Sequence, residues 1–238
     1  MLIGLDKMLT LERHKKILRL LEVNKSLTVM ELCSELFVSP ATVRRDLVVL
    51  EKEGLLKRSY GGAVINESYT DQIPLSLRST KNLKAKKKIC SKAAEFIKAG
   101  QTIFIDNSST TYFLVPFLKS IPDLTVVTNN PVICTALAEH KIRCFCTGGE
   151  MLSGSIALVG SEAERFVSGI NADACFISSC GYDDKFCYDI SKRERDLKIA
   201  MLEHSKKRFY LCDTSKKGKE FPFTITSVLN IDKIIDET

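Results

Sequence analysis

The chain has 238 residues, of which 45% are hydrophobic and 27% charged, and its formal net charge is +6. This length and apolar content allow one large or two smaller domains with a full core, and exclude a wholly disordered chain. No apolar run approaches the ~18 residues of a membrane-spanning helix. The N-terminus lacks the pattern of a signal peptide. We therefore expect no membrane contact and a location in the cytoplasm.

The cysteines and histidines predict neither a disulfide framework nor a metal site. Nine cysteines are an odd number scattered over a long chain, which is typical of reduced thiols. A zinc site needs Cys pairs with two to four residues between them or His pairs with three to five, and the nearest approach is Cys144-x-Cys146, whose alternation suits a strand. His14, His140 and His204 are far apart in sequence. We predict no metal and no cofactor.

Two helices are predicted in the first 36 residues. From Thr10 onward, apolar residues recur at the i, i+3, i+4 spacing of an amphipathic helix, and Thr10 is a candidate N-cap. After a break at Asn24–Ser26, Thr28 and Glu31 form the sequence pattern of a capping box. A second helix is therefore expected to begin there.

A third helix is predicted from Ser39 as N-cap and Pro40 as first helical residue to about Glu53. One side of it is apolar, through Val43, Leu47 and Leu50. The other side and its flanks carry groups suited to phosphates and base edges in a major groove: Ala41, Thr42, Arg44, Arg45, Val48 and Lys52. An ordinary amphipathic helix with solvated arginines has the same pattern, and this helix alone does not separate the two interpretations.

The residues that follow favour DNA binding. Gly54 is a candidate helix C-cap, a short strand follows, and Gly61-Gly62 form a turn, which together predict a wing. Lys57 and Arg58 on the strand and Tyr60 at its tip would reach the sugar-phosphate backbone beside the groove. Charge adds little, because residues 1–62 hold 11 Lys and Arg against 8 Asp and Glu.

Four segments closely resemble the DeoR-type repressors of bacterial sugar catabolism: Glu12-Arg13-His14, Val38 to Leu47, Gly54-Leu55-Leu56 and Tyr60 to Ala63. The resemblance implies a winged helix-turn-helix domain over residues 8–65, with the helix-turn-helix at about 27–46 and contacts to double-stranded operator DNA. The protein would then lie at the nucleoid when bound to DNA. The predicted DNA-binding residues are Thr28, Ser39, Pro40, Ala41, Thr42, Arg44, Arg45, Lys57, Arg58, Tyr60, Gly61 and Gly62.

A polar stretch over residues 66–72 predicts a linker, which we place at 66–78, before a second domain over 79–238. The start of that domain is strongly basic, through Arg78, Lys81, Lys84, Lys86, Lys87, Lys88 and Lys92. Such a run usually forms a solvated helix face, and DNA contact is the alternative.

Five apolar runs of strand length alternate with helical stretches, at 102–106, 124–128, 143–147, 174–178 and 208–213. They predict buried parallel strands in an α/β domain with helices on both faces of the sheet. Ligands of such folds bind at the carboxyl ends of the strands. Four of these ends are rich in polar residues or glycine, at 106–111, 128–130, 147–149 and 213–217. Glu194 and Lys198, four residues apart on a predicted helix, share a face and form either a surface ion pair or part of a site.

The same segments resemble the C-terminal sensor of the family, which is similar to ribose-5-phosphate isomerase. The resemblance implies a phosphorylated sugar effector that weakens operator binding. The predicted effector-binding residues are Asp106, Asn107, Ser108, Ser109, Thr110, Thr111, Thr128, Asn129, Asn130, Gly148, Gly149, Asp183, Glu194, Lys198, Ser215 and Lys216. Two positions depart from the family: Ser108 replaces a glycine and is expected to restrict the loop backbone, and Leu152 replaces a common arginine.

Two other functions fit parts of the sequence. Isomerases of this fold resemble Asp-Gly-x-Asp where this chain has Cys180-Gly181-Tyr182-Asp183, so a thiol replaces one carboxylate, and we predict no catalytic residues. An activator or architectural DNA protein without a ligand is the third class, against which the polar strand ends argue. Operators of helix-turn-helix proteins are usually pseudo-palindromic or repeated, so a homodimer or homotetramer is expected.

Overall fold

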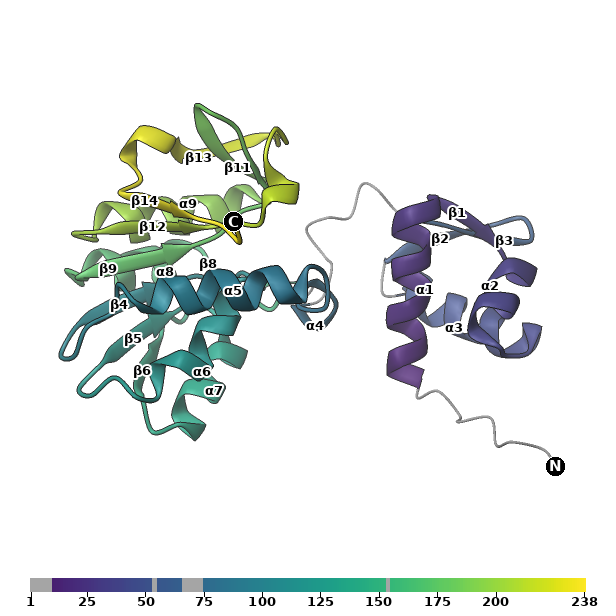
Figure 1. Cartoon of the computed structure of the whole chain (residues 1–238), viewed down its shortest axis with the longest axis horizontal. Coiled ribbons are helices and arrows are strands. Elements are labelled where there is room, and N and C mark those ends of the chain that lie inside the picture. The colour runs from purple at the N-terminus through teal and green to yellow at the C-terminus, as the bar shows by residue number, and fades with distance from the viewer. Residues whose placement is uncertain (1–9, 53–54, 66–74, 153–154) are drawn as a thin grey trace. The chain divides into compact units, whose positions relative to one another are not determined.

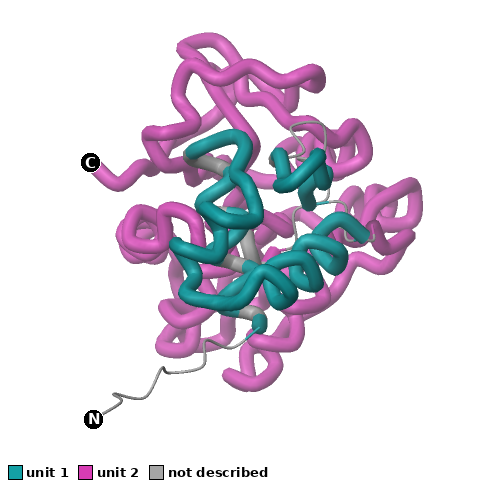
Figure 2. The backbone as a smooth tube through the Cα atoms, turned by 90° about the vertical axis from the view of Figure 1, so that its right-hand side faces the viewer, with its two compact units in different colours: residues 1–73 teal, residues 74–238 magenta. Residues whose placement is uncertain are grey.

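The computed structural model describes residues 10–52, 55–152 without 66–74, and 155–238. The chain divides into two compact units, Met1–Ile73 and Pro74–Thr238 (Figure 2). Among the described residues, no helix combines the length and the apolar character needed to cross a membrane.

The first unit contains three helices and a small antiparallel sheet (Figure 1). The helices are α1 (Thr10–Asn24), α2 (Val29–Leu36) and α3 (Pro40–Lys52), and the strands β1 (Ser26–Thr28), β2 (Leu56–Ser59) and β3 (Gly62–Ile65) lie in the order β1-β3-β2. The core joins all three helices through Ile17, Leu21, Leu32, Leu36, Val43, Leu47 and Leu50. Strand β1 was not expected, because it is only three residues long and ends at the cap of α2.

The helix starts predicted at Thr28 and Ser39 have the expected chemistry, whereas Thr10, predicted as an N-cap, lies within α1. The Thr28 hydroxyl accepts a hydrogen bond from the Glu31 backbone N–H at 3.2 Å, and the Glu31 carboxylate accepts one from the Thr28 N–H at 2.7 Å, which confirms the capping box. At α3, the Ser39 hydroxyl accepts from the Thr42 N–H at 3.3 Å. Helix α2 ends at Phe37, whose φ of 55° turns the chain toward α3. The predicted C-cap Gly54 lies outside the described residues.

The second unit contains a six-stranded sheet in which every pairing is parallel (Figure 1). Its strands, in spatial order, are β14 (Lys233–Ile235), β12 (Arg208–Leu211), β9 (Ala174–Ile177), β4 (Thr102–Ile105), β5 (Thr125–Thr128) and β6 (Arg143–Cys146). The five predicted strands are present, and the short edge strand β14 was not predicted. The predicted fold class, a winged helix-turn-helix followed by an α/β domain with a mostly parallel sheet, is confirmed.

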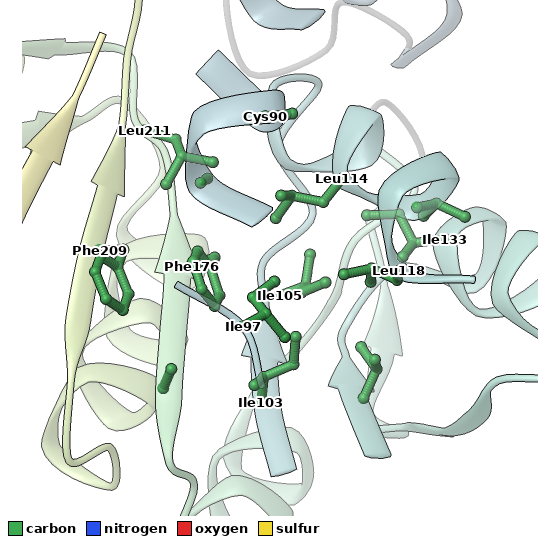
Figure 3. Close-up of a cluster of buried hydrophobic side chains, with 14 of the residues drawn as sticks. Cys90, Ile97, Ile103, Ile105, Leu114, Leu118, Ile133, Phe176, Phe209 and Leu211 are labelled. Carbon is green, nitrogen blue, oxygen red and sulfur yellow. The ribbon is translucent and has the colours of Figure 1, made fainter. Parts of the chain in front are cut away.

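Apolar side chains alternate between the two faces of this sheet, and each face has its own helices. One face packs against α5 (Leu83–Ala94), η2 (Thr111–Leu114), α6 (Val115–Leu118) and α7 (Pro131–Glu139). The other packs against α8 (Ser161–Ser168) and α9 (Lys192–Glu203). Figure 3 shows part of the first cluster, with Ile103, Ile105 and Phe176 on the strands and Leu114 and Leu118 on the covering segments.

Smaller elements complete the second unit. Strands β10 (Gly181–Tyr182), β11 (Phe186–Asp189) and β13 (Phe223–Ser227) form an antiparallel sheet, and β7 (Glu150–Met151) pairs with β8 (Leu158–Val159). Two short 3₁₀ turns follow β12 and β13, η3 (Thr214–Lys216) and η4 (Val228–Asn230). Of the expected linker at 66–78, residues 66–74 lie outside the described chain and Leu75–Arg78 form the helix α4.

Candidate functional site

Helix α3 presents the face that the sequence predicts for DNA. Ala41, Arg44 and Arg45 are exposed, whereas the opposite stripe, including Val43 and Leu47, is buried. The structure thus places two guanidiniums on the solvent side of the first two turns of a helix whose other side is held in a core. This geometry is suited to a major groove, which admits an α-helix and exposes base edges to it.

A buried ion cluster, which the sequence did not predict, attaches α3 to α1. The Asp46 carboxylate is 5% exposed and accepts hydrogen bonds from Arg13 Nε at 2.5 Å and Arg13 Nη2 at 2.9 Å, and it lies 3.0 Å from His14 Nε2. Burial raises the pKa of Asp46, but the hydrogen bonds from Arg13 and His14 outweigh it, so that the pKa is lowered from its ordinary value. The cluster fixes the rotation of α3 about its axis.

The wing is a β2–β3 hairpin with Tyr60 fully exposed at its turn and Gly61 at φ 81°. Lys57 is exposed on β2. Arg58 is also exposed, but its Nε lies 2.5 Å from Glu51 Oε2, so this guanidinium is already engaged by the end of α3. That ion pair joins the wing to the helix whose face it flanks.

Gly62, predicted among the DNA-binding residues, is instead buried between strands. A Cβ at this position would lie 2.3 Å from the Leu27 carbonyl oxygen of β1, so only glycine lets β3 approach β1 this closely. Its role is therefore to let the hairpin pair with β1. Thr28 and Ser39 are exposed at the helix starts that their hydroxyls cap.

In the second unit, the four predicted polar strand ends lie along one edge of the sheet because β12, β4, β5 and β6 run parallel. The end of β9 lies among them and adds Ser178 and Ser179, which the sequence analysis did not include. Lys216 Nζ donates to the Ser178 hydroxyl at 3.0 Å and to the Ser179 carbonyl at 2.7 Å, and the Ser178 N–H donates to Asp106 Oδ2 at 3.1 Å. These bonds link the ends of β12, β9 and β4.

The loop after β4 is a buried hydroxyl cluster from Asp106 to Thr111. Asp106 Oδ1 accepts from the Ser108 N–H at 3.1 Å and from the Thr111 hydroxyl at 2.8 Å. Ser108 is not among the residues with positive φ, so serine adopts this loop without backbone strain. The restriction expected at Ser108 therefore does not strain the loop, because the loop does not need the left-handed conformation there.

Lys86 belongs to the same site and was missed. It is 4% exposed, and its Nζ donates to the Ser109 hydroxyl at 2.9 Å and to the Arg78 carbonyl at 2.5 Å. The solvated-face prediction was wrong for this lysine. Its spacing contained the signal, because Lys86 precedes Ile89 and Cys90 by three and four residues and so lies on the buried stripe of α5.

The ammonium group of Lys86 loses its proton near neutral pH. Burial and the positive charge of Lys216 lower its pKa to about 7, although the Asp213 carboxylate opposes the shift. Asp213 in turn accepts from Asn82 Nδ2 at 2.8 Å, and the same amide donates to the Ser215 hydroxyl at 3.0 Å. Two cations, Lys86 and Lys216, thus lie among the hydroxyls of this edge.

Glu194 and Lys198 are both buried, so the surface-ion-pair interpretation was wrong. Lys198 Nζ lies 2.5 Å from Asp189 Oδ2 and 3.5 Å from Asp106 Oδ2. Burial lowers the pKa of Lys198, but the carboxylates of Asp189, Asp106 and Glu194 outweigh it and raise the pKa above its ordinary value. Glu194 Oε2 accepts from Asn107 Nδ2 at 3.3 Å. The sequence did not indicate Asp189, because it lies at the end of β11 and its partner Lys198 lies on α9, nine residues further along the chain.

Three asparagines at the strand ends have buried amide atoms without a hydrogen-bond partner in the described chain. These atoms are Asn107 Oδ1, Asn129 Oδ1 and Asn130 Nδ2, and the Ser155 hydroxyl shares this property. The other end of each amide is engaged: Asn129 Nδ2 donates to the Leu158 carbonyl at 3.1 Å, and Asn130 Oδ1 caps α7 at the Val132 N–H. Unpaired buried polar atoms are costly unless a ligand or water satisfies them.

Two predicted glycines take the conformations for which glycine is suited, Gly148 at φ 72° and Gly149 at φ 100°, and a Cβ at Gly149 would lie 2.5 Å from the Val159 carbonyl oxygen.

Asp183 does not join the strand-end cluster. Its oxygens accept from the Lys185 and Phe186 N–H groups and from the Tyr188 hydroxyl, so it fixes the β10–β11 turn.

All nine cysteines are free thiols. Within the described residues, no three His, Cys, Asp or Glu side chains are placed to hold a metal ion. The polar strand ends thus bring together lysines, hydroxyls and amides, which suit an anionic, hydroxyl-bearing ligand. They also hold the buried carboxylates of Asp106, Asp189 and Glu194, which lie around Lys198.

Comparison with known proteins covers both units. The family described as DeoR-like helix-turn-helix domain matches residues 13–69, and that described as DeoR C terminal sensor domain matches residues 81–238. The HTH-type transcriptional regulator GolR of Listeria innocua is 34% identical over 97% of this chain and 91% of its own length. The glycerol-3-phosphate regulon repressor of Escherichia coli is 29% identical over 94% and 89%.

Among solved structures, a D-ribose-5-phosphate isomerase in complex with phospho-erythronic acid is similar over 56% of this chain and 52% of that chain, with 15% identity and a TM-score of 0.43. The sequence matches, which extend over both the helix-turn-helix and the sensor, show that this chain belongs to the DeoR family of transcriptional regulators.

Proposed function

We propose that this protein represses a carbohydrate-catabolism operon and leaves its operator when a phosphorylated sugar binds at the strand ends of the second unit. The α3 face with Arg44 and Arg45 would read the operator, and Lys57 and Tyr60 of the wing would contact its backbone. Names of relatives support the class of regulated genes, since they include a glycerol-3-phosphate regulon repressor and a putative aga operon repressor.

The observation that carries the effector proposal is the division of the strand-end edge into two chemistries. Lys216 follows β12 and Ser109 follows β4, and Lys86 on α5 donates to Ser109; these groups suit a phosphate. The β4 and β5 ends hold the unpartnered amide atoms of Asn107, Asn129 and Asn130, which suit sugar hydroxyls. From β9 to β5 is two strand spacings, about 10 Å, a span suited to a phosphorylated sugar lying across the ends.

The partners of the carboxylates support a site that binds a sugar phosphate rather than one that catalyses its isomerisation. Proton transfer next to a carbonyl needs a positioned base. Asp106 and Asp189 are paired with Lys198, and Asp183 is engaged in a turn. The position that would supply one acidic partner is Cys180, whose pKa is raised to about 12 by burial and by Asp189. An assay with ribose 5-phosphate and its homologues tests this, since turnover would overturn the sensor proposal.

The ligand half is tested by thermal unfolding of the full chain with a panel of sugar phosphates. A ligand at about 100 times its Kd should raise the Tm by about 5–10 °C. The matched controls are the unphosphorylated sugars and inorganic phosphate, each of which satisfies only one half of the site. If no sugar phosphate stabilises the protein, the effector proposal is wrong.

The regulatory half is tested by operator binding at fixed salt, with DNA from upstream of this gene. We expect a shift of the operator band in a gel that an excess of unrelated DNA does not compete away. With the stabilising sugar phosphate, we expect operator affinity to fall at least tenfold, or by about 1.4 kcal/mol. Operator affinity that rises with the ligand would indicate an activator or co-repressed protein instead.

A homodimer or homotetramer is expected from the pseudo-palindromic operators of this class, and light scattering measures it.

A further inference from the structure

Three partly exposed cysteines lie together at the edge of the main sheet. Cys134 is on the second turn of α7, and Cys144 and Cys146 alternate along the edge strand β6, so they share one face of it. Cys134 Sγ lies 3.4 Å from Cys144 Sγ, and Cys144 Sγ lies 3.5 Å from the Cys134 carbonyl oxygen. All three are partly exposed, whereas Cys90, Cys175, Cys187 and Cys212 of this unit are buried.

We propose that Cys134 and Cys144 are a redox-modification site, at which a peroxide forms a reversible disulfide between α7 and β6. One thiolate attacks the peroxide oxygen, giving a sulfenic acid and releasing water or an alcohol. The second thiol then displaces the sulfenic hydroxyl as water. Overall, the two thiols lose two protons and two electrons, and the peroxide takes them up. A dithiol reductant reverses the bond by exchange.

The geometry needs only a small movement. A disulfide brings its sulfurs to about 2.05 Å, so these two must approach by about 1.4 Å. The movement involves an edge strand, which has a sheet neighbour on one side alone. Only ten residues separate the two cysteines, so the bond closes a short loop within one helix–strand unit.

The thiols of Cys144 and Cys146 are protonated at neutral pH, which sets the conditions for the reaction. Burial and the neighbouring Cys134 raise the pKa of Cys144 to about 11, and burial and Cys134 also raise the pKa of Cys146 to about 11. The thiolate is the reacting form, so oxidation should accelerate as the pH rises from 7 to 9. The pair would therefore respond to sustained rather than brief exposure to oxidant.

The linked elements carry part of the candidate effector site. Helix α7 begins next to its cap Asn130, and β6 leads directly to Thr147 and the glycine pair. A bond between α7 and β6 thus constrains the carboxyl ends of β5 and β6 relative to each other. This consequence rests on the proposed function, but the disulfide itself does not.

Peptide mapping of the full chain tests the proposal. Trypsin cleaves after Lys119, Lys141, Arg143 and Arg165, so a bond from Cys134 joins the peptides 120–141 and 144–165. After hydrogen peroxide and alkylation, we expect the joined peptide within a monomeric chain that has lost two hydrogen atoms, and its disappearance with dithiothreitol. Cys144→Ser should abolish it and Cys146→Ser should leave it.

Cys33→Ser is the matched control, because Cys33 is partly exposed in the other unit and should not affect the bond. The proposal is overturned if the peptides stay separate under conditions that oxidise Cys33, if they are joined only in covalent dimers, or if they join equally in the Cys144→Ser protein. Circular dichroism of each variant establishes that it is folded, so that loss of the bond is assigned to loss of the thiol.

Discussion

The guanidinium of Arg13 on α1 holds the carboxylate of Asp46 on α3, with 2.5 Å from Nε to Oδ2 and 2.9 Å from Nη2 to Oδ1. Asp46 follows Arg44 and Arg45 directly, so the residue that anchors the helix adjoins those that face solvent. The direction in which Arg44 and Arg45 point therefore depends on an ion pair between residues that are 33 positions apart in the sequence.

Asp46→Asn should destabilise the first unit by about 3 kcal/mol, because it removes the buried carboxylate charge that accepts two hydrogen bonds from the guanidinium of Arg13. Operator affinity should fall as well, since α3 loses its anchor. Urea unfolding followed by a probe of the first unit measures the stability. Glu51→Gln, which removes the exposed pair with Arg58, is the control and should change stability much less. Equal losses for the two variants would contradict the buried anchor.

The same carboxylate predicts acid sensitivity. The pKa of Asp46 is lowered in the folded state. Its stabilisation is therefore fully present above the unfolded value of about 3.9 and is lost as the pH falls through the lower folded pKa. Below about pH 4 the stability of the first unit should fall more steeply in the wild type than in Asp46→Asn. Parallel pH profiles of the two proteins would argue against this linkage.

Arg45→Ala should weaken specific operator binding by about 1–3 kcal/mol and relax base preference, if Arg45 reads a base edge. Lys57→Ala on the exposed wing should weaken all DNA similarly and lower the slope of log affinity against log salt by about one. Titrations of operator and random duplexes over a salt series separate the two effects. Direct readout by Arg45 is excluded if its removal costs the same on both duplexes.

Lys86→Met should reduce affinity for the effector at least tenfold, or about 1.4 kcal/mol, because it removes a buried cation from the proposed phosphate end. Lys87→Ala is the matched control, since Lys87 is the exposed neighbour on the same helix. Calorimetric titration with the sugar phosphate identified by thermal shift measures both. Unchanged affinity in Lys86→Met would remove Lys86 from the site.

Effector affinity should also depend on pH through Lys86. Its pKa is lowered to about 7, so in the free protein the side chain is mostly neutral above that pH and must take up a proton to pair with a phosphate. Sugar phosphates are already dianions there, because their second pKa is about 6. Affinity should therefore decline between pH 7 and 9, by at most about tenfold per pH unit. In Lys86→Met the profile should be flat over this range.

Asp189→Asn should destabilise the second unit by about 3–5 kcal/mol, because Lys198 is buried and loses its nearest carboxylate. Replacing both residues, as Lys198→Met with Asp189→Leu, removes both charges of the pair but also takes the ammonium from buried Asp106, so it should recover only part of the loss. Lys206→Ala removes an exposed pair with Asp173 and serves as the control. A double variant less stable than Asp189→Asn would show that the pair itself is needed.

Local patterns predicted the starts of α2 and α3, five of the six strands of the main sheet and the polar strand ends, because caps and periodicity involve residues a few positions apart. The prediction of Lys86 as solvated was wrong because the count of lysines around it outweighed its place on the apolar stripe of α5. Asp183 was carried over from a motif, but in this chain its carboxylate caps the adjacent turn. No pattern indicated the pairing of Asp46 with Arg13.

The sequence alone determined which helix is amphipathic with two arginines outward, where the strands end, and that those ends carry hydroxyls, amides and glycines. Tertiary structure decided which of these groups are used in internal hydrogen bonds and which remain free to bind a ligand. Hydrogen bonds such as Asn82 to Asp213, 131 residues apart, and Lys86 to Ser109 exist only once parallel strands bring their ends to one edge. Burial there sets the pKa of Lys86 and leaves the asparagine amides without partners, because both depend on the exclusion of water by residues distant in the chain.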